Sequence, residues 1–112
     1  MKIAYLLAVP LIACAQVSNA AVATTQGTIA LMRDSTLLQP DGRLQGVFLL
    51  QLSVPLSNGC NWVWISPTDK ATQGVALSAK AMGAQVTLWY DNTIVAPWGE
   101  TDICGAVNID LN

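Results

Sequence analysis

Residues 60–67, CNWVWISP, place two tryptophans one residue apart shortly after a cysteine. In an extended chain, side chains two positions apart share a face, so Trp62 and Trp64 point to one side and Val63 and Ile65 to the other. Both faces of this segment are apolar, which predicts a strand that is covered on both sides. If Val63 and Ile65 line an interior, the two indole rings must be covered by another part of the chain, by a partner or by a ligand.

Two further strands are predicted before this segment. Residues 28–33 (TIALMR) alternate well enough for a half-buried strand, and residues 21–26 are expected to be a loose lead into it. Residues 46–54 (GVFLLQLSV) are almost continuously apolar, as expected of a central strand. Between these strands, residues 39–43 (QPDGR) contain Pro-Asp-Gly, in which proline presets one backbone angle and glycine tolerates a positive one. We therefore expect the two strands to form a hairpin.

A helix and a fourth strand are predicted after this segment. Residues 69–82 (DKATQGVALSAKAM) are small and compatible with a helix, which Thr68 could cap at its start and Gly83 at its end. Residues 84–91 (AQVTLWYD) then alternate as a half-exposed strand, with Trp89 on the less apolar side. The helix follows residues 60–67 directly, so it is the nearest segment that could cover the tryptophan face.

Residues 103–112 (ICGAVNIDLN) form the last predicted strand, with Val107, Ile109 and Leu111 facing inward. The order of elements is thus three strands, one short helix and two strands. Five strands and one helix in a single small domain over residues 21–112 predict an α+β fold. We expect a small five-stranded barrel or a curled antiparallel sheet, with the helix between strands three and four.

This order of elements, with residues 79–91 (AKAMGAQVTLWYD) at the junction of helix and strand, resembles the oligonucleotide/oligosaccharide-binding (OB) fold. It is similar in particular to the small secreted pentameric binding subunits of bacterial toxins, which use this fold to hold sugars. Residues 79–91 also resemble small secreted proteobacterial proteins. The resemblance covers residues 45–112 and implies an OB-like barrel that acts by binding, as an oligomer. It carries over no sugar-binding residue.

Residues 1–20 predict export. Residues 3–15 (IAYLLAVPLIACA) are apolar, and Ser18 and Ala20 are the small residues that a signal peptidase reads. The apolar run is shorter than the roughly 20 residues of a membrane-spanning helix, and no second run follows. We therefore predict a secreted or periplasmic protein without an integral membrane span.

A second interpretation of the same region is a lipid anchor. Residues 11–14 (LIAC) resemble a bacterial lipobox, in which the cysteine is acylated and becomes the new N-terminus. Under this alternative the protein is an envelope lipoprotein, anchored to the outer membrane through Cys14 and with a structural role.

Residues 21–112 contain two cysteines, Cys60 and Cys104. In an oxidising compartment, two thiols in one small domain most simply form a disulfide. The same region holds four basic and seven acidic residues, a net charge of −3, and neither sign is clustered. Because a phosphate backbone is bound by clustered basic side chains, nucleic acid is not an expected partner.

Catalysis is not expected either. The chain contains no histidine, which removes Ser-His and Cys-His nucleophiles and the usual proton shuttle at neutral pH. Glu100 and Asp102 could bring two carboxylates together, but no dense set of oxygen ligands surrounds them, so a solvated acidic loop is the better interpretation. We predict no metal and no cofactor.

The tryptophans carry the functional prediction. An exposed indole ring can lie against the C–H face of a sugar while neighbouring Asn or Asp side chains bind its hydroxyls, and indole is also a frequent anchor at protein interfaces. Each ring could equally be part of the core or its boundary. We predict a secreted, non-enzymatic binding module that contacts a glycan or a protein partner, with self-association as a further expectation. The predicted ligand-binding residues are Trp62, Trp64, Trp89, Trp98, Asn61 and Asp91.

Overall fold

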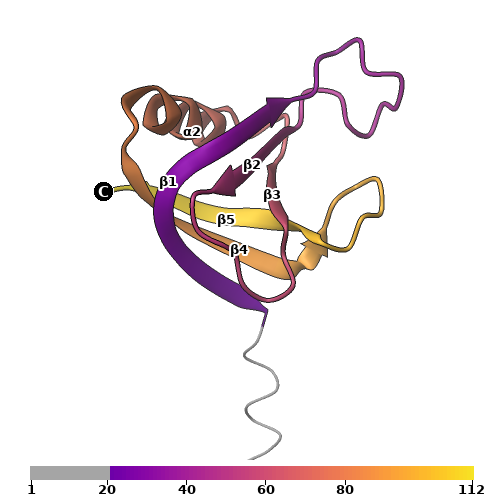
Figure 1. Cartoon of the computed structure of the whole chain (residues 1–112). Helices are drawn as coiled ribbons and strands as arrows, with labels where there is room; N and C mark the ends of the chain where they lie inside the picture. Colours follow the sequence, from indigo (N-terminus) through magenta and orange to yellow (C-terminus); the bar gives the residue numbers. More distant parts are fainter. Residues whose placement is uncertain (1–20) are drawn as a thin grey trace, which may run out of the picture.

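The computed structural model describes residues 21–112, so the predicted signal peptide and the lipid anchor at Cys14 lie outside the described residues. Five strands form a closed barrel in the order β1-β2-β3-β5-β4 (Figure 1). All neighbouring strands are antiparallel except β3 and β5, which are parallel. The elements are β1 (Val22–Asp34), β2 (Phe48–Leu52), β3 (Trp62–Ile65), α2 (Lys70–Met82), β4 (Gln85–Val95) and β5 (Ile103–Leu111).

This architecture confirms the predicted OB-like α+β barrel with one short helix between strands three and four. The sheet is a closed, mixed barrel and not a curled antiparallel sheet, because β1 returns to β4 and β3 pairs in parallel with β5. The predicted hairpin of the first two strands is also present, as β1 and β2.

β1 is longer than predicted and pairs with two strands, β4 and β2. Its first half, from Val22 to Thr28, pairs with β4, and its second half pairs with β2. Figure 1 shows the bend that this requires (indigo to purple). The prediction that residues 21–26 are a loose lead is wrong. Their inward positions, Ala23 and Thr25, are small or polar, so the segment lacks an apolar signal, and the pairing with β4 makes it a strand.

The barrel interior is filled mainly by aliphatic side chains, together with the fully buried Tyr90. Ala76 and Ala79 of α2 belong to this core, so the helix closes one end of the barrel (Figure 1). Asp69, and not Thr68, caps the helix, since its carboxylate accepts a hydrogen bond from the Thr72 N–H at 3.3 Å. The core residues from the strands include Ile29, Leu50, Leu52, Val63, Ile65, Val86, Leu88 and Ile109.

β5 contains a bulge that the alternation of its sequence hides. Trp89 pairs with Asn108 and Tyr90 with Ala106, so Val107 is an extra residue on β5. Such an insertion changes which side chains face inward. Ala106 therefore packs on the core before the bulge and Ile109 after it, whereas Val107 is 52% exposed and Leu111, at the strand end, 46%. The prediction that Val107 faces inward is wrong. Leu111 does lie on the inner face, opposite the buried Val86, but its place at the strand end leaves it half-exposed.

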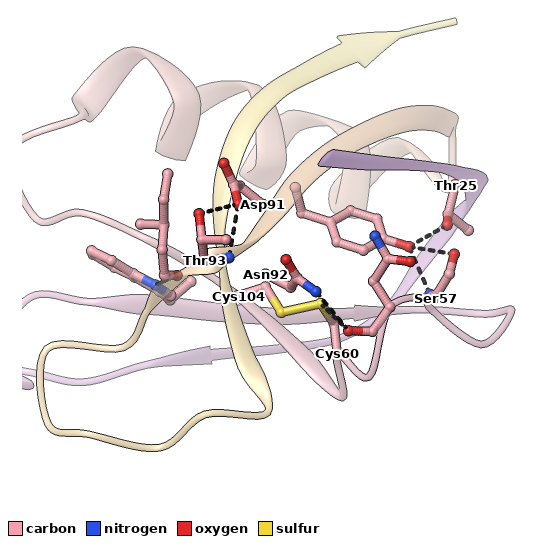
Figure 2. Close-up of a disulfide and its surroundings, with 11 residues drawn as sticks. Thr25, Ser57, Cys60, Asp91, Asn92, Thr93 and Cys104 are labelled. Atoms are coloured by element: carbon pink, nitrogen blue, oxygen red, sulfur yellow. Dashed lines mark hydrogen bonds between the residues drawn. A yellow bond between two sulfur atoms is a disulfide. The ribbon is translucent and has the colours of Figure 1, made fainter. Parts of the chain in front are cut away.

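The disulfide is present as predicted. Cys60 and Cys104 are joined across a Cα–Cα distance of 5.8 Å, and both are buried (Figure 2). Cys60 lies just before β3, and Cys104 is the parallel partner of Val63 in that strand. The bridge therefore supports the β3–β5 pairing, which spans only three residue pairs. None of the helices within residues 21–112 has the length and apolar character to cross a membrane.

Candidate functional site

Three of the four predicted tryptophans gather on the outer side of the barrel. Trp62, Trp64 and Trp98 are half-buried and pack together with four buried aliphatic residues in a second apolar cluster, which we call the outer cluster. The expectation that α2 covers the tryptophan face is wrong, because α2 packs on the barrel interior. Residues from the connection between β4 and β5 and from β2 take its place. The aliphatic members of the outer cluster are Val47, Leu49, Ala96 and Ile103.

The indole N–H groups of Trp64 and Trp98 are hydrogen-bonded, and a charged side chain lies over the ring of Trp62. The Trp64 Nε1 donates to the carbonyl oxygen of Ile94 at 3.3 Å, and the Trp98 Nε1 donates to the Glu100 carboxylate. The Arg33 guanidinium lies over the Trp62 ring, 5.1 Å from its centre, as in a cation–π contact. The chain therefore occupies much of the surface that a ligand would need on Trp62, Trp64 and Trp98.

Asn61 is exposed, but its backbone is used to join strands. The Asn61 N–H donates to the carbonyl oxygen of Asp102 at 2.7 Å, and its own carbonyl and side-chain oxygens accept from Gln51 Nε2 at 3.0 and 3.3 Å. Asn61 lines a hollow of about 290 Å³ beside the disulfide, formed with residues 51–56. It does not lie beside a freely exposed ring.

Trp89 differs from the other three rings. It points outward from β4 and is 39% exposed, while its neighbours Leu88 and Tyr90 are fully buried. In the antiparallel register it stands between Thr24 of β1 and Asn108 of β5, so the ring lies in the middle of a three-stranded outer surface. We call this surface the Trp89 face.

The next row of the Trp89 face is polar. Thr87 stands between Gln26 of β1 and Asp110 of β5. Gln26 Nε2 donates to the Thr87 hydroxyl at 3.1 Å, and that hydroxyl donates to Asn112 Oδ1 at 3.1 Å. The Trp89 face thus consists of Thr24, Gln26, Thr87, Trp89, Asn108 and Asp110.

A further hydrogen bond orients the β5 side of this face. Asn108 Nδ2 donates to Asp110 Oδ1 at 2.8 Å. Because these bonds use only some of the donors and acceptors, amide and carboxylate atoms beside the indole are held in place and still face solvent. On the other side of the ring, Val22 and Val107 are exposed and extend the apolar surface.

Asp91 lies two residues after Trp89 on β4, and its Oδ1 atom accepts two hydrogen bonds from Thr93. Asp91 Oδ1 accepts from the Thr93 hydroxyl at 2.6 Å and from the Thr93 N–H at 2.8 Å (Figure 2). This holds residues 92–94, which bulge out of β4 between its pairs with Gly105 and Cys104. The hydrogen bond from the Thr93 side chain and then that from its backbone lower the pKa of Asp91 below its usual value.

The Thr93→Val variant should raise the pKa of Asp91 toward its usual value, because the side-chain hydrogen bond is lost and the backbone bond is kept. Since folding lowers this pKa, the interaction stabilises the fold at neutral pH, and this stabilisation disappears as the pH falls through the lowered pKa. NMR titration of the Asp91 carboxyl carbon measures the shift. Thr93→Ser is the matched control and should keep the lowered pKa. An unchanged titration in Thr93→Val would contradict the assignment.

The acidic loop offers no further site. Glu100 is bonded to Trp98, and the backbone oxygen of Asp102 accepts from the N–H groups of Asn61 and Trp62. Within residues 21–112, no three acidic or cysteine side chains are grouped so that they could hold a metal ion.

The chain matches no protein-family model, no curated protein and no solved structure. Its function must therefore be inferred from the geometry. Of the six predicted site residues, Trp89 lies at the centre of an exposed surface, with Asp91 next to it on the same strand. The polar residues around Trp89 were missed by the sequence analysis. Alternation within residues 21–26 and a pairing of that segment with residues 84–91 would have identified Thr24 and Gln26.

Proposed function

We propose that this protein is an exported, non-enzymatic binding protein and that its Trp89 face holds a glycan. The observation that carries this proposal is the exposed indole of Trp89 in the middle of three paired strands, flanked in register by Thr24 and Asn108. The buried disulfide supports the location, since such bonds persist in the periplasm and outside the cell.

The chemistry of the Trp89 face suits a sugar better than an apolar protein surface. The indole provides a flat apolar platform, and Val107 beside it widens that platform. The polar row at Thr87 provides hydroxyl, amide and carboxylate groups that can exchange hydrogen bonds with ring hydroxyls. A partner protein bound mainly by burial of apolar surface would have to desolvate this row.

The Trp89→Ala variant should bind glycans at least about tenfold more weakly than the wild type, since an exposed aromatic anchor at the centre of a contact surface contributes most of the affinity. A glycan array identifies the sugar, and calorimetry with that sugar gives the dissociation constants. Trp89→Phe keeps a smaller ring and should lose less. Val54→Ala, which shortens an exposed apolar side chain outside the Trp89 face, is the control and should bind normally. Absence of any bound glycan, or full binding by Trp89→Ala, would refute the proposal.

The alternative is that the same domain is an envelope lipoprotein with a structural role. It depends on residues 11–14 (LIAC), whose cysteine would carry the anchor. Mass spectrometry of the mature N-terminus separates the two possibilities. A chain that begins at Ala21 excludes the lipoprotein, whereas an acylated Cys14 establishes it.

Self-association remains a further proposal. The sequence suggested that Trp62 and Trp64 would bind a second copy of the chain. They are weaker candidates in the structure, because the outer cluster covers much of both rings. Two highly exposed leucines in the β1–β2 loop, Leu37 and Leu38, now give the stronger reason. Light scattering at micromolar concentration should give a mass above that of the monomer.

A further inference from the structure

Part of one edge of β5 has no strand beside it among the described residues. β3 pairs with β5 only from Ile103 to Gly105, and β4 pairs with the other edge along the whole strand. From Ala106 to Leu111, the edge that continues beyond β3 is therefore open among the described residues. α2 packs against this end of β5, and Figure 1 shows both at the same end of the barrel.

The register shows which backbone groups point to the open edge. The Asn112 N–H donates to the carbonyl oxygen of Gln85 at 3.0 Å, which makes these two residues a hydrogen-bonded pair. In an antiparallel ladder, such pairs alternate with pairs that direct their N–H and C=O groups to the opposite sides. Asp110 therefore bonds to β4, whereas Ile109 and Leu111 direct their N–H and C=O groups to the open edge.

A groove of about 610 Å³ runs along this edge, between α2 and β5. The helix contributes small side chains to it, and apart from the adjoining residues and the backbone of α2 no atom lies within 4 Å of the position that a Cβ would take on Gly74. The volume is in the range of known ligand sites. The residues that line the groove are Ala71, Gly74, Val75 and Ser78 of α2 and Ile109, Asp110 and Leu111 of β5.

We propose that this groove binds an extended peptide segment of a partner protein, which adds to β5 as a sixth strand. Its backbone would bond to Ile109 and Leu111, since an open strand edge binds extended chains in this way. Its inward side chains would be small or β-branched, since these suit an extended strand and fit the open space over Gly74. Asp110 is the only charged residue that lines the groove, so an outward lysine or arginine of the peptide would complement it.

A second copy of this chain is a poorer occupant. If two β5 edges paired so that Ile109 of one copy bonded to Leu111 of the other, the two Asp110 carboxylates would lie opposite each other. Like charges directly opposite in a sheet are destabilising. This surface uses the edge of β5 and not the outward Trp89 ring, although it shares Asp110 with the Trp89 face.

The test uses amide hydrogen exchange, followed by NMR. In the free protein the amides of Ile109 and Leu111 should exchange faster than that of Asp110, because only the latter bonds to β4. The probe is a nonapeptide that alternates threonine and valine, with lysine in place of the central threonine. Bound peptide should slow the exchange of Ile109 and Leu111 by about tenfold or more at saturation.

Variants of Gly74 distinguish filling of the groove from changes in the helix. Gly74→Leu and Gly74→Ala both favour the helix, but only leucine fills the groove. We expect Gly74→Leu to abolish the protection of Ile109 and Leu111 by the peptide and Gly74→Ala to keep it. Asp110→Asn should weaken binding by about threefold, as should a peptide with glutamate in place of lysine.

Four results would overturn the proposal. The first is slow exchange of Ile109 and Leu111 in the free monomer, which would mean that the edge is already occupied. The second is a lack of added protection at these two residues up to the solubility limit of the peptide. The third is equal binding by Gly74→Leu and wild type. Protection that appears without peptide, together with a doubled mass in light scattering, would assign the edge to a second copy and overturn the proposal as well.

Discussion

Replacement of both bridged cysteines, as Cys60→Ala/Cys104→Ala, should lower the free energy of unfolding by about 4 kcal/mol. The bridge connects residues 44 positions apart, and closing a loop of that length restricts the unfolded chain strongly. A domain of this size has a limited core, so a loss of about 4 kcal/mol would be a large part of its stability. Urea denaturation followed by circular dichroism measures the change.

Reduced wild-type protein is the control for this variant. It should unfold at a similarly low urea concentration, because it loses the same cross-link and keeps both sulfur atoms. A difference below about 1 kcal/mol between the oxidised protein and the double variant would contradict the expectation. It would mean that the unfolded chain is already compact around β3 and β5.

The Tyr90→Phe variant should lose about 2 kcal/mol of unfolding free energy. Tyr90 is fully buried, and its hydroxyl oxygen accepts a hydrogen bond from the Ser57 N–H at 2.8 Å. The same hydroxyl is hydrogen-bonded to the hydroxyls of Thr25, at 2.6 Å, and of Ser57, at 3.1 Å. Thr25 and Ser57 face each other across this point in Figure 2. Phenylalanine would leave the Ser57 N–H without its acceptor.

Thr25→Val is the matched control for Tyr90→Phe. It removes one of the hydrogen bonds of the Tyr90 hydroxyl and leaves the acceptor of the Ser57 N–H in place. Its loss should be no more than about 1 kcal/mol. Equal losses in the two variants, measured in the same urea denaturation experiment, would show that the Ser57 bond contributes little. The loss in Tyr90→Phe would then come from the hydrogen bond to Thr25.

Local patterns in the sequence predicted most of the fold. The alternation in residues 84–91, the apolar run of 46–54 and the glycine after the helix each depend on neighbours a few positions away. The disulfide was predicted because residues 21–112 offer only one pair of cysteines. These features need no knowledge of which strands are adjacent.

The features that the sequence did not predict depend on register. Ala96 and Ile103 cover Trp62 and Trp64 because β5 lies beside β3 in parallel, and no local pattern specifies that pairing. The extra residue at Val107 was not predicted, because the prediction assumed that inward and outward side chains alternate without interruption. Residues 21–26 show little apolar signal, so their membership of β1 appears only once β4 is placed beside them.

The same register problem is why the sequence identified only part of the candidate site. Trp89 was found because it is a tryptophan on the polar side of a strand. Thr24 and Asn108 are common residue types whose importance comes from their position on either side of it. Trp62 and Trp64 were predicted to bind a ligand just as Trp89 was, since composition does not distinguish a half-buried indole from an exposed one.

The pairing of β1 with β4 also constrains the order in which the chain can fold. Gln26 and Thr87 touch across 61 positions, so the first half of β1, Val22 to Thr28, has no partner until most of the polypeptide has been synthesised. Contacts between such distant positions form late and slowly. If the protein is exported, as proposed, this late pairing would leave the N-terminal half of β1 unpaired during synthesis, and a narrow translocation channel passes unfolded chains.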